Sequence, residues 1–384
     1  MTYNFLSEDT LVFWLQRLVR FPSEQTALQE NDPNIKAFIK KCVAPLLKEL
    51  NLGPCQYDEM GNLILQLGKN KSEKSILFLT YAMTHPAATM EDPFNATIIK
   101  TSAGPAIRGR GVAEQKTAMA AAIAAVAQTA TEGISGQLIF AAVSAGETGR
   151  HDAVKSVLSN LKNKPDFAII CLGTDGKIAS GNKGRLDVDV TVRGKATHSS
   201  MPWKGIDAIA GAQHCLKILK GLKLGASKNA SFTPATLTPT SIHSEPDATH
   251  TLQDTVKMTF DRRLLPGEDP DKAFNNIKKA LKDTKPWSIE CVKGNHMYPN
   301  EVQEDGALLP LIKKSYDDAN VEQKDPIICD FALDAGYFGN LGIEAVMLGP
   351  GQIDQFHSSE ESVLIRDMVD IANIYHRLMT NVLL

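Results

Sequence analysis

Residues 186–192 read Leu-Asp-Val-Asp-Val-Thr-Val, and this stretch decides how the chain is divided. Apolar and polar residues alternate along it, as in a strand with one face against a core and the other in water. The residues before it follow another pattern, because buried apolar runs such as 167–172 alternate with helical segments such as 115–129 and 152–161. Such alternation is typical of β-α-β units on a mostly parallel sheet. We therefore predict a domain boundary close to residue 185.

The residues after this stretch predict a small α+β domain and then a return to the first pattern. The expected elements are a helix at 205–219, strands at 235–242 and 256–263, a helix at 271–281, a strand at 287–292, and then a helix at 308–319, a strand at 345–348 and a helix at 361–383. Strand 186–192 and the next five form a β-α-β-β-α-β order, that of a ferredoxin-like sandwich. We predict a discontinuous α/β domain, residues 1–184 and 295–384, with an α+β domain, residues 185–294, inserted in it.

Composition excludes several classes of protein. Hydrophobic residues make up 43% of the 384 residues and the formal charge is -3, so the chain lacks the basic field that binds nucleic acid or an anionic membrane. The N-terminal residues do not resemble a secretory signal, and the Ala-rich stretch 117–130 is too short to cross a bilayer. Six scattered cysteines without a C-x-x-C pair fit a reducing compartment. We expect a cytoplasmic protein with no nucleic-acid or membrane partner.

Four segments carry a family resemblance. They are Arg-Gly-Arg-Gly-Val-Ala-Glu-Gln-Lys at 108–116, Val-Arg-Gly-Lys-Ala-Thr-His-Ser-Ser-Met-Pro at 192–202, Asp-Arg-Arg-Leu-Leu-Pro-Gly at 261–267, and Gly-Pro-Gly at 349–351 followed by His357 and Glu361. Each alone is a weak signal, but the four occur in order over nearly the whole chain. Together they resemble the superfamily of zinc aminoacylase, acetylornithine deacetylase, succinyl-diaminopimelate desuccinylase and carboxypeptidase G.

This resemblance implies an α/β/α metallopeptidase-like domain and an inserted ferredoxin-like domain through which the chain forms a homodimer. It also implies hydrolysis of an amide bond in a small amino-acid-like substrate. In the family, two zinc ions share a carboxylate and a glutamate activates water. Each of these roles has a matching position in this chain.

At three positions the residue does not suit the role that the family gives it. Tyr81 and Met83 stand where the family has a His-x-Asp pair at the end of a strand, and neither phenol nor thioether is a good zinc ligand. Gly146 stands at the position of the general base, whose loss typically removes ~10²–10⁴-fold of rate. His85 is close enough in sequence to compensate for the lost histidine, although a surface histidine is the alternative.

Other positions retain a metal ligand type. His357 keeps the register of the family's last ligand, Glu147 that of a carboxylate ligand, and Glu114 replaces the bridging aspartate with a side chain one methylene longer. Asp175 is the candidate for the ligand that follows strand 167–172, with a turn-forming role as the alternative. These residues predict one divalent metal, zinc, in place of two. The alternative is a metal-free site in which the carboxylates pair with basic residues such as Lys116 or Arg110.

The substrate-binding positions are better retained. The resemblance assigns His198 to polarisation of the scissile carbonyl, in the site of a partner subunit, and Arg263 to the substrate carboxylate. His250 stands where the family often has an asparagine that contacts substrate. A plain loop histidine is the alternative for His198, and pairing with Asp261 on the same strand is the alternative for Arg263.

The expected function is therefore an amidohydrolase that cleaves the C–N bond of an N-acyl amino acid or small peptide with a reduced, single-metal site. Two alternatives stay open, because Gly146 removes the group that activates water. One is a metal-free protein that binds carboxylates. The other is an enzyme that transfers acyl groups or forms amides.

Overall fold

The computed structural model describes residues 4–68, 74–146 and 148–384. They separate into two compact units: the first comprises Met1–Gly181, Glu301–Ile327 and Tyr337–Leu384, and the second comprises Asn182–Asn300 and Ile328–Gly336. The stretch 328–336 belongs to the second unit, whereas our division had assigned it to the first. Hydrogen bonding explains the difference, because the backbone N–H of Lys183 donates to the Cys329 carbonyl at 3.0 Å and the Lys183 ammonium lies 3.0 Å from Asp330.

A mixed sheet forms the centre of the first unit. Its strands there run in the order β1 (Gln56–Tyr57), β2 (Leu63–Gly68), β6 (Gln137–Val143), β3 (Ser75–Tyr81), β7 (Phe167–Cys171) and β17 (Glu344–Leu348). The four strands β6, β3, β7 and β17 are parallel, and β2 pairs antiparallel with β6. Every residue of β3, β6 and β7 is buried, as is expected of a parallel sheet covered on both faces. The α/β class predicted from the apolar runs is confirmed.

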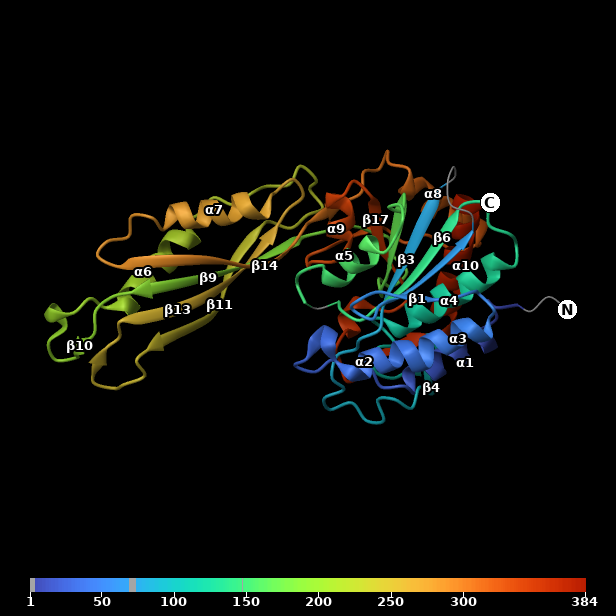
Figure 1. The fold of residues 1–384 in the computed structure, drawn as a ribbon, viewed down its shortest axis with the longest axis horizontal. Coiled ribbons are helices and arrows are strands. Elements are labelled where there is room, and N and C mark those ends of the chain that lie inside the picture. Colours follow the sequence, from blue (N-terminus) through green and yellow to red (C-terminus); the bar gives the residue numbers. More distant parts are fainter. Residues whose placement is uncertain (1–3, 69–73, 147) are drawn as a thin grey trace. The chain divides into compact units, whose positions relative to one another are not determined.

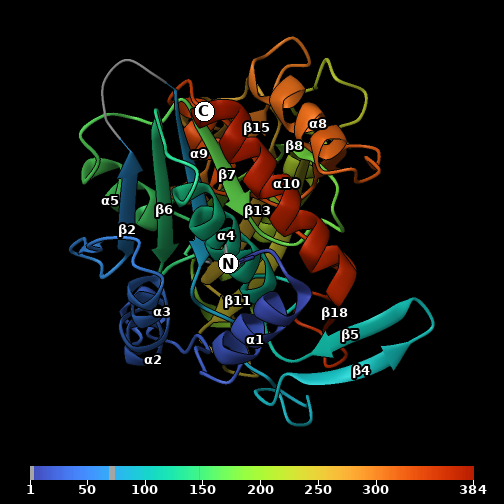
Figure 2. The same cartoon turned by 90° about the vertical axis from the view of Figure 1, so that its right-hand side faces the viewer.

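Helices cover this sheet, as Figures 1 and 2 show. The helices α4 (Lys116–Ala130), α5 (Asp152–Ser159) and α10 (Ile365–Leu383) contact its strands, α1 (Glu8–Val19) packs on α4, and α8 (Leu308–Asp318) packs on α10. The Ala-rich helix α4 is buried nearly throughout and packs against α1, α10 and β3, because its small side chains permit close approach on every side. The connection from β3 through α4 to β6 runs one way along the sheet, and the connection from β6 through α5 to β7 runs the other way. Because such connections are right-handed, α4 and α5 lie on opposite faces of the sheet.

Further elements complete the structure. The helices are α2 (Pro33–Phe38), η2 (Ile39–Val43, a π turn), α3 (Ala44–Glu49), α9 (Ala335–Asn340) and the 3-10 turns η1 (Gln29–Asn31), η3 (Pro202–Lys204) and η4 (Ile353–Gln355). The strands are β4 (Thr97–Thr101), β5 (Gly104–Arg108), β8 (Ala179–Asn182), β10 (Thr197–His198), β12 (Thr251–Leu252), β15 (Asn300–Glu301), β16 (Ile327–Cys329) and β18 (Ser362–Leu364). Within the described ranges, no helix is both long and apolar enough to span a membrane.

The last helix begins later than predicted. Residues 362–364 form β18, which pairs antiparallel with β5 (Figure 2), and helix α10 starts only at Ile365. The pairing sets Ser362 opposite Arg108 and Val363 opposite Ile107. The helical pattern of the sequence extends back to residue 361, but the pairing with β5 holds residues 362–364 in a strand.

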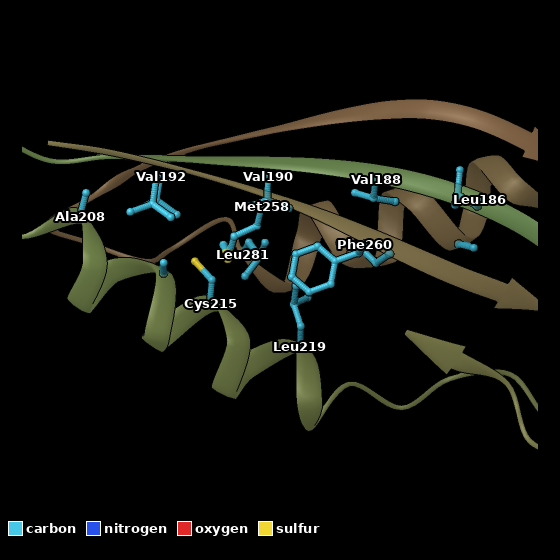
Figure 3. Packing of buried hydrophobic residues seen from close by; sticks show 14 of the residues in the cluster. Leu186, Val188, Val190, Val192, Ala208, Cys215, Leu219, Met258, Phe260 and Leu281 are labelled. Carbon is cyan, nitrogen blue, oxygen red and sulfur yellow. The ribbon is translucent and has the colours of Figure 1, made fainter. Parts of the chain in front are cut away.

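The second unit has one four-stranded antiparallel sheet and two helices. The sheet order is β11 (Thr236–Glu245), β13 (Thr255–Leu264), β9 (Gly184–Arg193) and β14 (Ser288–Met297), and the helices are α6 (Ala208–Lys220) and α7 (Pro270–Ala280). The alternation in 186–192 is borne out, because Leu186, Val188, Val190 and Val192 are all buried. Figure 3 shows these side chains in one cluster with Cys215 and Leu219 of α6 and with Phe260 of β13.

The buried histidine of α10 predicts a pH dependence of stability. Burial lowers the pKa of His376 below its ordinary value of 6.5, although Glu132, 2.8 Å away, partly offsets this effect. Below about pH 6.5 the unfolded chain therefore binds a proton that the folded chain does not. We expect the wild type to lose stability relative to His376→Leu as the pH falls from about 7 to about 5. Urea unfolding at both pH values measures this. An equal change in the free energy of unfolding between the two pH values for both proteins contradicts it.

Candidate functional site

The candidate site of the first unit lies where the parallel strands end. Tyr81 ends β3, Val143 ends β6, Cys171 ends β7 and Leu348 ends β17. The carboxyl ends of parallel strands share one edge of a sheet, where open α/β folds place ligands. The segments that follow these strands carry the residues singled out from the sequence. Their contacts show which of these residues come together.

The loop that carries Glu114 connects β5 to α4 and is held by one buried carboxylate. Glu361 accepts hydrogen bonds from the backbone N–H groups of Gly111 at 2.8 Å, Ala113 at 2.9 Å and Glu114 at 3.2 Å. The Arg110 guanidinium lies 3.1 Å from the same carboxylate, and both side chains are buried. Burial raises the pKa of Glu361, and these donors and Arg110 oppose that shift.

Glu114 and His357 meet at this edge. The Nε2 atom of His357 lies 3.3 Å from Oε2 of Glu114, with the glutamate buried and the histidine exposed. His357 has a φ of 62°, a left-handed conformation that a histidine adopts at a cost. Two ligand atoms at tetrahedral angles on a zinc ion, each at about 2.0–2.1 Å, are about 3.3 Å apart. The separation of these two atoms therefore fits two ligands of one zinc ion.

His85 also reaches this point. Its ring stacks on that of His357 with a centroid separation of 3.4 Å and an interplanar angle of 32°. This contact places the histidine that follows β3 beside the Glu114–His357 pair. A metal cluster is nevertheless not formed by these side chains, since no group of three or more His, Cys, Asp or Glu able to hold a metal ion occurs among the described residues. Glu147, the other predicted carboxylate ligand, lies outside the described residues.

Tyr81 and Gly146 fit together sterically. A Cβ atom added at Gly146 would lie 2.8 Å from Cδ1 and 3.0 Å from Cε1 of the Tyr81 ring, closer than real Cβ contacts. The ring is buried at the end of β3, so it has little room to move away. Met83 is buried nearby and lies 3.7 Å from the Gln115 amide nitrogen. The space beside residue 146 is thus filled by an aromatic ring, and the described residues offer no metal ligand at 81 or 83.

The basic residues near Glu114 have other partners. The Lys116 ammonium donates to the Leu18 and Phe21 carbonyls at 3.0 and 2.9 Å, and burial lowers its pKa to about 7. Arg110 pairs with Glu361. The alternative in which Glu114 pairs with Lys116 or Arg110 is therefore not what the structure has, because the Glu114 carboxylate lies against the His357 ring.

Asp175 does not join the Glu114–His357 pair through its carboxylate. That group lies 3.1 Å from the Lys324 ammonium and 3.5 Å from that of Lys177. Its backbone N–H donates to the Gly351 carbonyl at 2.7 Å, and its φ of 58° is typical of an aspartate in a turn. These contacts match the turn-forming alternative, and a ligand role for Asp175 stays a prediction.

The predicted substrate residues belong to the second unit. His198 is exposed on β10, and its Nδ1 accepts a hydrogen bond from the Ser200 backbone N–H at 3.2 Å. A neutral His198 with Nδ1 as an acceptor carries its proton on Nε2, which suits donation to a carbonyl oxygen. His250 is exposed, and its backbone carbonyl accepts from the Ser199 N–H at 2.9 Å.

Arg263 has a partner on its own strand. Its Nε lies 2.8 Å from Oδ1 of Asp261 and its Nη2 donates to Oδ2 at 2.9 Å, a two-point pairing. This contact is the alternative that the sequence left open. A substrate carboxylate can bind Arg263 only by competing with Asp261 or by using the remaining guanidinium N–H groups.

Sequence reasoning did not predict the anchoring role of Glu361 or the packing of Tyr81 against Gly146. Glu361 was identified only by its register with the motif of His357. A signal for the second feature exists in the sequence, since a large residue at 81 and a glycine at 146 depart from the family pattern together. Only the pairing of β3 with β6, which sets Tyr81 opposite Val143, brings them into contact.

Comparisons with known proteins identify relatives of this chain. The family model described as Peptidase family M20/M25/M40 matches residues 84–381. A peptidase M20 domain-containing protein of Schizosaccharomyces pombe is 25% identical over 379 residues, which cover 97% of this chain and 84% of that protein. The succinyl-diaminopimelate desuccinylase of Aliarcobacter butzleri is 22% identical over 95% of this chain and 98% of its own length. The crystal structure of a Staphylococcus aureus tripeptidase shares the fold, with a TM-score of 0.76, 20% identity and 98% of both chains covered.

The contact between Tyr81 and residue 146 predicts a strong coupling. We expect Gly146→Ala to lower the free energy of unfolding by about 1–3 kcal/mol, because its Cβ overlaps the buried ring. In a Tyr81→Ala background the same substitution should cost less than about 0.5 kcal/mol. Gly221→Ala is the control, since a Cβ there meets nothing nearer than 3.6 Å. Urea unfolding of the four proteins of the cycle measures the coupling, and additive effects refute it.

Proposed function

The chain belongs to the peptidase family M20/M25/M40, and on that premise we propose that it hydrolyses the C–N amide bond of an N-acyl amino acid or small peptide with a single-metal site. The observation that carries the proposal is the 3.3 Å separation between Nε2 of His357 and Oε2 of Glu114. It supports one ion held by these two residues, with Glu147 as the third ligand by its position in the motif. The second metal of the family is lost, since Tyr81 and Met83 replace its ligand and the residue that orients it.

The chain's own residues divide the work of the proposed reaction. A bound zinc ion supplies Lewis-acid chemistry. His198 donates a hydrogen bond from its Nε2–H to the negative charge that develops on the carbonyl oxygen. Arg263 orients the substrate carboxylate with the guanidinium N–H groups that Asp261 leaves unused. Turnover is slow, because Gly146 provides no general base and the Tyr81 ring fills the adjacent space.

The substrate class and assembly follow from the same premise. Relatives named for desuccinylation and deacetylation of amino acids support a small N-acylated amino acid as substrate. We assign the protein to the cytoplasm, where its six cysteines, all free, remain reduced. In the homodimer, the exposed His198 of one chain serves the site of the other.

Two other functions fit the Tyr81–Gly146 contact. The ring leaves no room for a water-activating side chain at 146. Suppressed hydrolysis suits an enzyme that passes an acyl group to an amine, or a protein that binds carboxylates without a metal. Incubation with an acyl donor and a panel of amines, followed by mass spectrometry, separates these functions. A new amide product with no free acid identifies transfer, and binding without turnover identifies the metal-free protein.

Metal content tests the single-metal site. After zinc supplementation and dialysis, we expect about one ion per wild-type chain by mass spectrometry, and below about 0.1 for Glu114→Gln and His357→Ala. Hydrolysis of N-acyl amino acids should disappear together with the metal. Glu360→Gln and His214→Ala, at exposed positions, are matched controls that should keep both. The proposal is contradicted if the wild-type chain binds no metal and hydrolyses none of the N-acyl amino acids.

The assignment of His198 to a neighbouring active site predicts a stable dimer. Light scattering at micromolar concentration should return twice the mass of the 41.8 kDa chain. Mixing a His198→Ala chain with a Glu114→Gln chain should also restore up to about a quarter of the wild-type activity, since half of the chains pair as heterodimers with one intact site. A monomer mass, or no restored activity in the mixture, contradicts the role of His198 across the interface.

A further inference from the structure

The two proposed metal ligands of the first unit share one buried support. Glu361 lies four residues beyond His357 and begins the segment that continues into β18. Through β18 it is fixed against β5, which leads directly into the loop that carries Glu114. The backbone carbonyl of Glu361 also accepts from the Gly109 N–H at 3.3 Å. One residue is therefore attached to the segments of both ligands.

The side chain of Glu361 is bound at every side. One oxygen accepts from the N–H groups of Ala113 and Glu114, and the other from the N–H of Gly111 and the guanidinium of Arg110, all at 2.8–3.2 Å. All four partners are donors. The N–H of Glu114 is one of them, so the backbone of the ligand residue itself is held in place.

The opposite side of the loop is closed by backbone contacts. A Cβ at Gly173 or Gly351 would meet the Ala113 carbonyl oxygen at 2.1 or 1.9 Å, so these glycines pack directly on the loop. Gly111 has a φ of 82°, and a Cβ there would meet Thr84 at 2.6 Å. The loop is thus pressed between glycines and the Glu361 carboxylate, and few positions are open to Glu114.

We propose that Glu361 is a positioning residue, which sets the Glu114 carboxylate at the distance from His357 that one ion requires. The inference rests on the proposed single-metal function for the identity of the ion. Glu361 does not touch the ion or the substrate. It acts through the N–H groups of the Glu114 loop and through the short chain segment that connects it to His357.

The chemistry of the four donors requires a carboxylate at 361. A glutamine has one acceptor oxygen, and its NH₂ group would face an N–H or the Arg110 guanidinium, so donors would be opposed on one side. Buried donors left without an acceptor are costly, and the loop relieves that cost only by moving. Glu361→Gln therefore displaces Glu114 although the side chain keeps its size.

Zinc affinity of the whole chain tests the proposal. Isothermal titration calorimetry with zinc should give a Kd at least about 10-fold weaker for Glu361→Gln than for wild type, as for other residues that orient metal ligands. Glu360→Gln, at the exposed neighbouring position, is the matched control and should stay within about twofold. Circular dichroism confirms that each protein is folded at the temperature used. A residue that only stabilises the fold would lower the melting temperature and leave the Kd of the folded chain unchanged, and that result overturns the proposal.

A second variant and a second measurement keep the test decisive. Should Glu361→Gln not fold, Glu361→Asp retains the charge and withdraws it by one methylene, and a Kd equal to that of wild type again overturns the proposal. Should the wild type bind no zinc, the proposed function fails. Hydrogen exchange of the loop amides still measures whether Glu361 holds the Glu114 loop in place. Faster exchange of the Gly111, Ala113 and Glu114 amides in the variant, but not in Glu360→Gln, supports the positioning role; equal exchange overturns it.

Discussion

The arrangement of the first unit depends on one constraint: β6, β3, β7 and β17 are parallel and end at the same edge of the sheet. Segments that are far apart in sequence meet there because each follows one of these strands. The Ala113 carbonyl fits closely against the glycines after β7 and β17, and the Tyr81 ring at the end of β3 covers the glycine after β6. The site is therefore packed mainly by backbone, and small changes of side-chain size are felt throughout it.

Tyr81 and Gly146 are best understood as one unit of packing. An aromatic ring occupies the volume that a side chain at 146 needs, so the residue types at 81 and 146 are sterically coupled. A Cβ atom at 146 overlaps this ring, so any larger residue there requires the ring to move. Glu114 and His357 lie on two other loops, between β5 and α4 and between β17 and β18, and do not share this constraint.

Much of the fold could be predicted because its elements have strong local patterns. Apolar runs mark β3, β6 and β7 as strands that are buried on both faces, and the alternation along β9 marks a strand buried on one face. Weak patterns were missed. The residues of β4 are mostly exposed and show no period, and β18 was assigned to a helix because only its pairing with β5 makes it a strand. The stretch 328–336 joined the other unit through hydrogen bonds that no local pattern encodes.

The sequence by itself determined the family resemblance, the α/β and α+β organisation, and the identities of the substituted residues, since these depend on residue type and spacing. Tertiary structure alone decided which of the retained residues meet. It brought the Glu114 carboxylate to His357 and stacked the His85 ring on the His357 ring. It also placed the Asp175 carboxylate beside two lysines and paired Arg263 with Asp261. The physical reason is that a short-range contact depends on the register of strands and the course of loops, to which residues far apart in the chain contribute together.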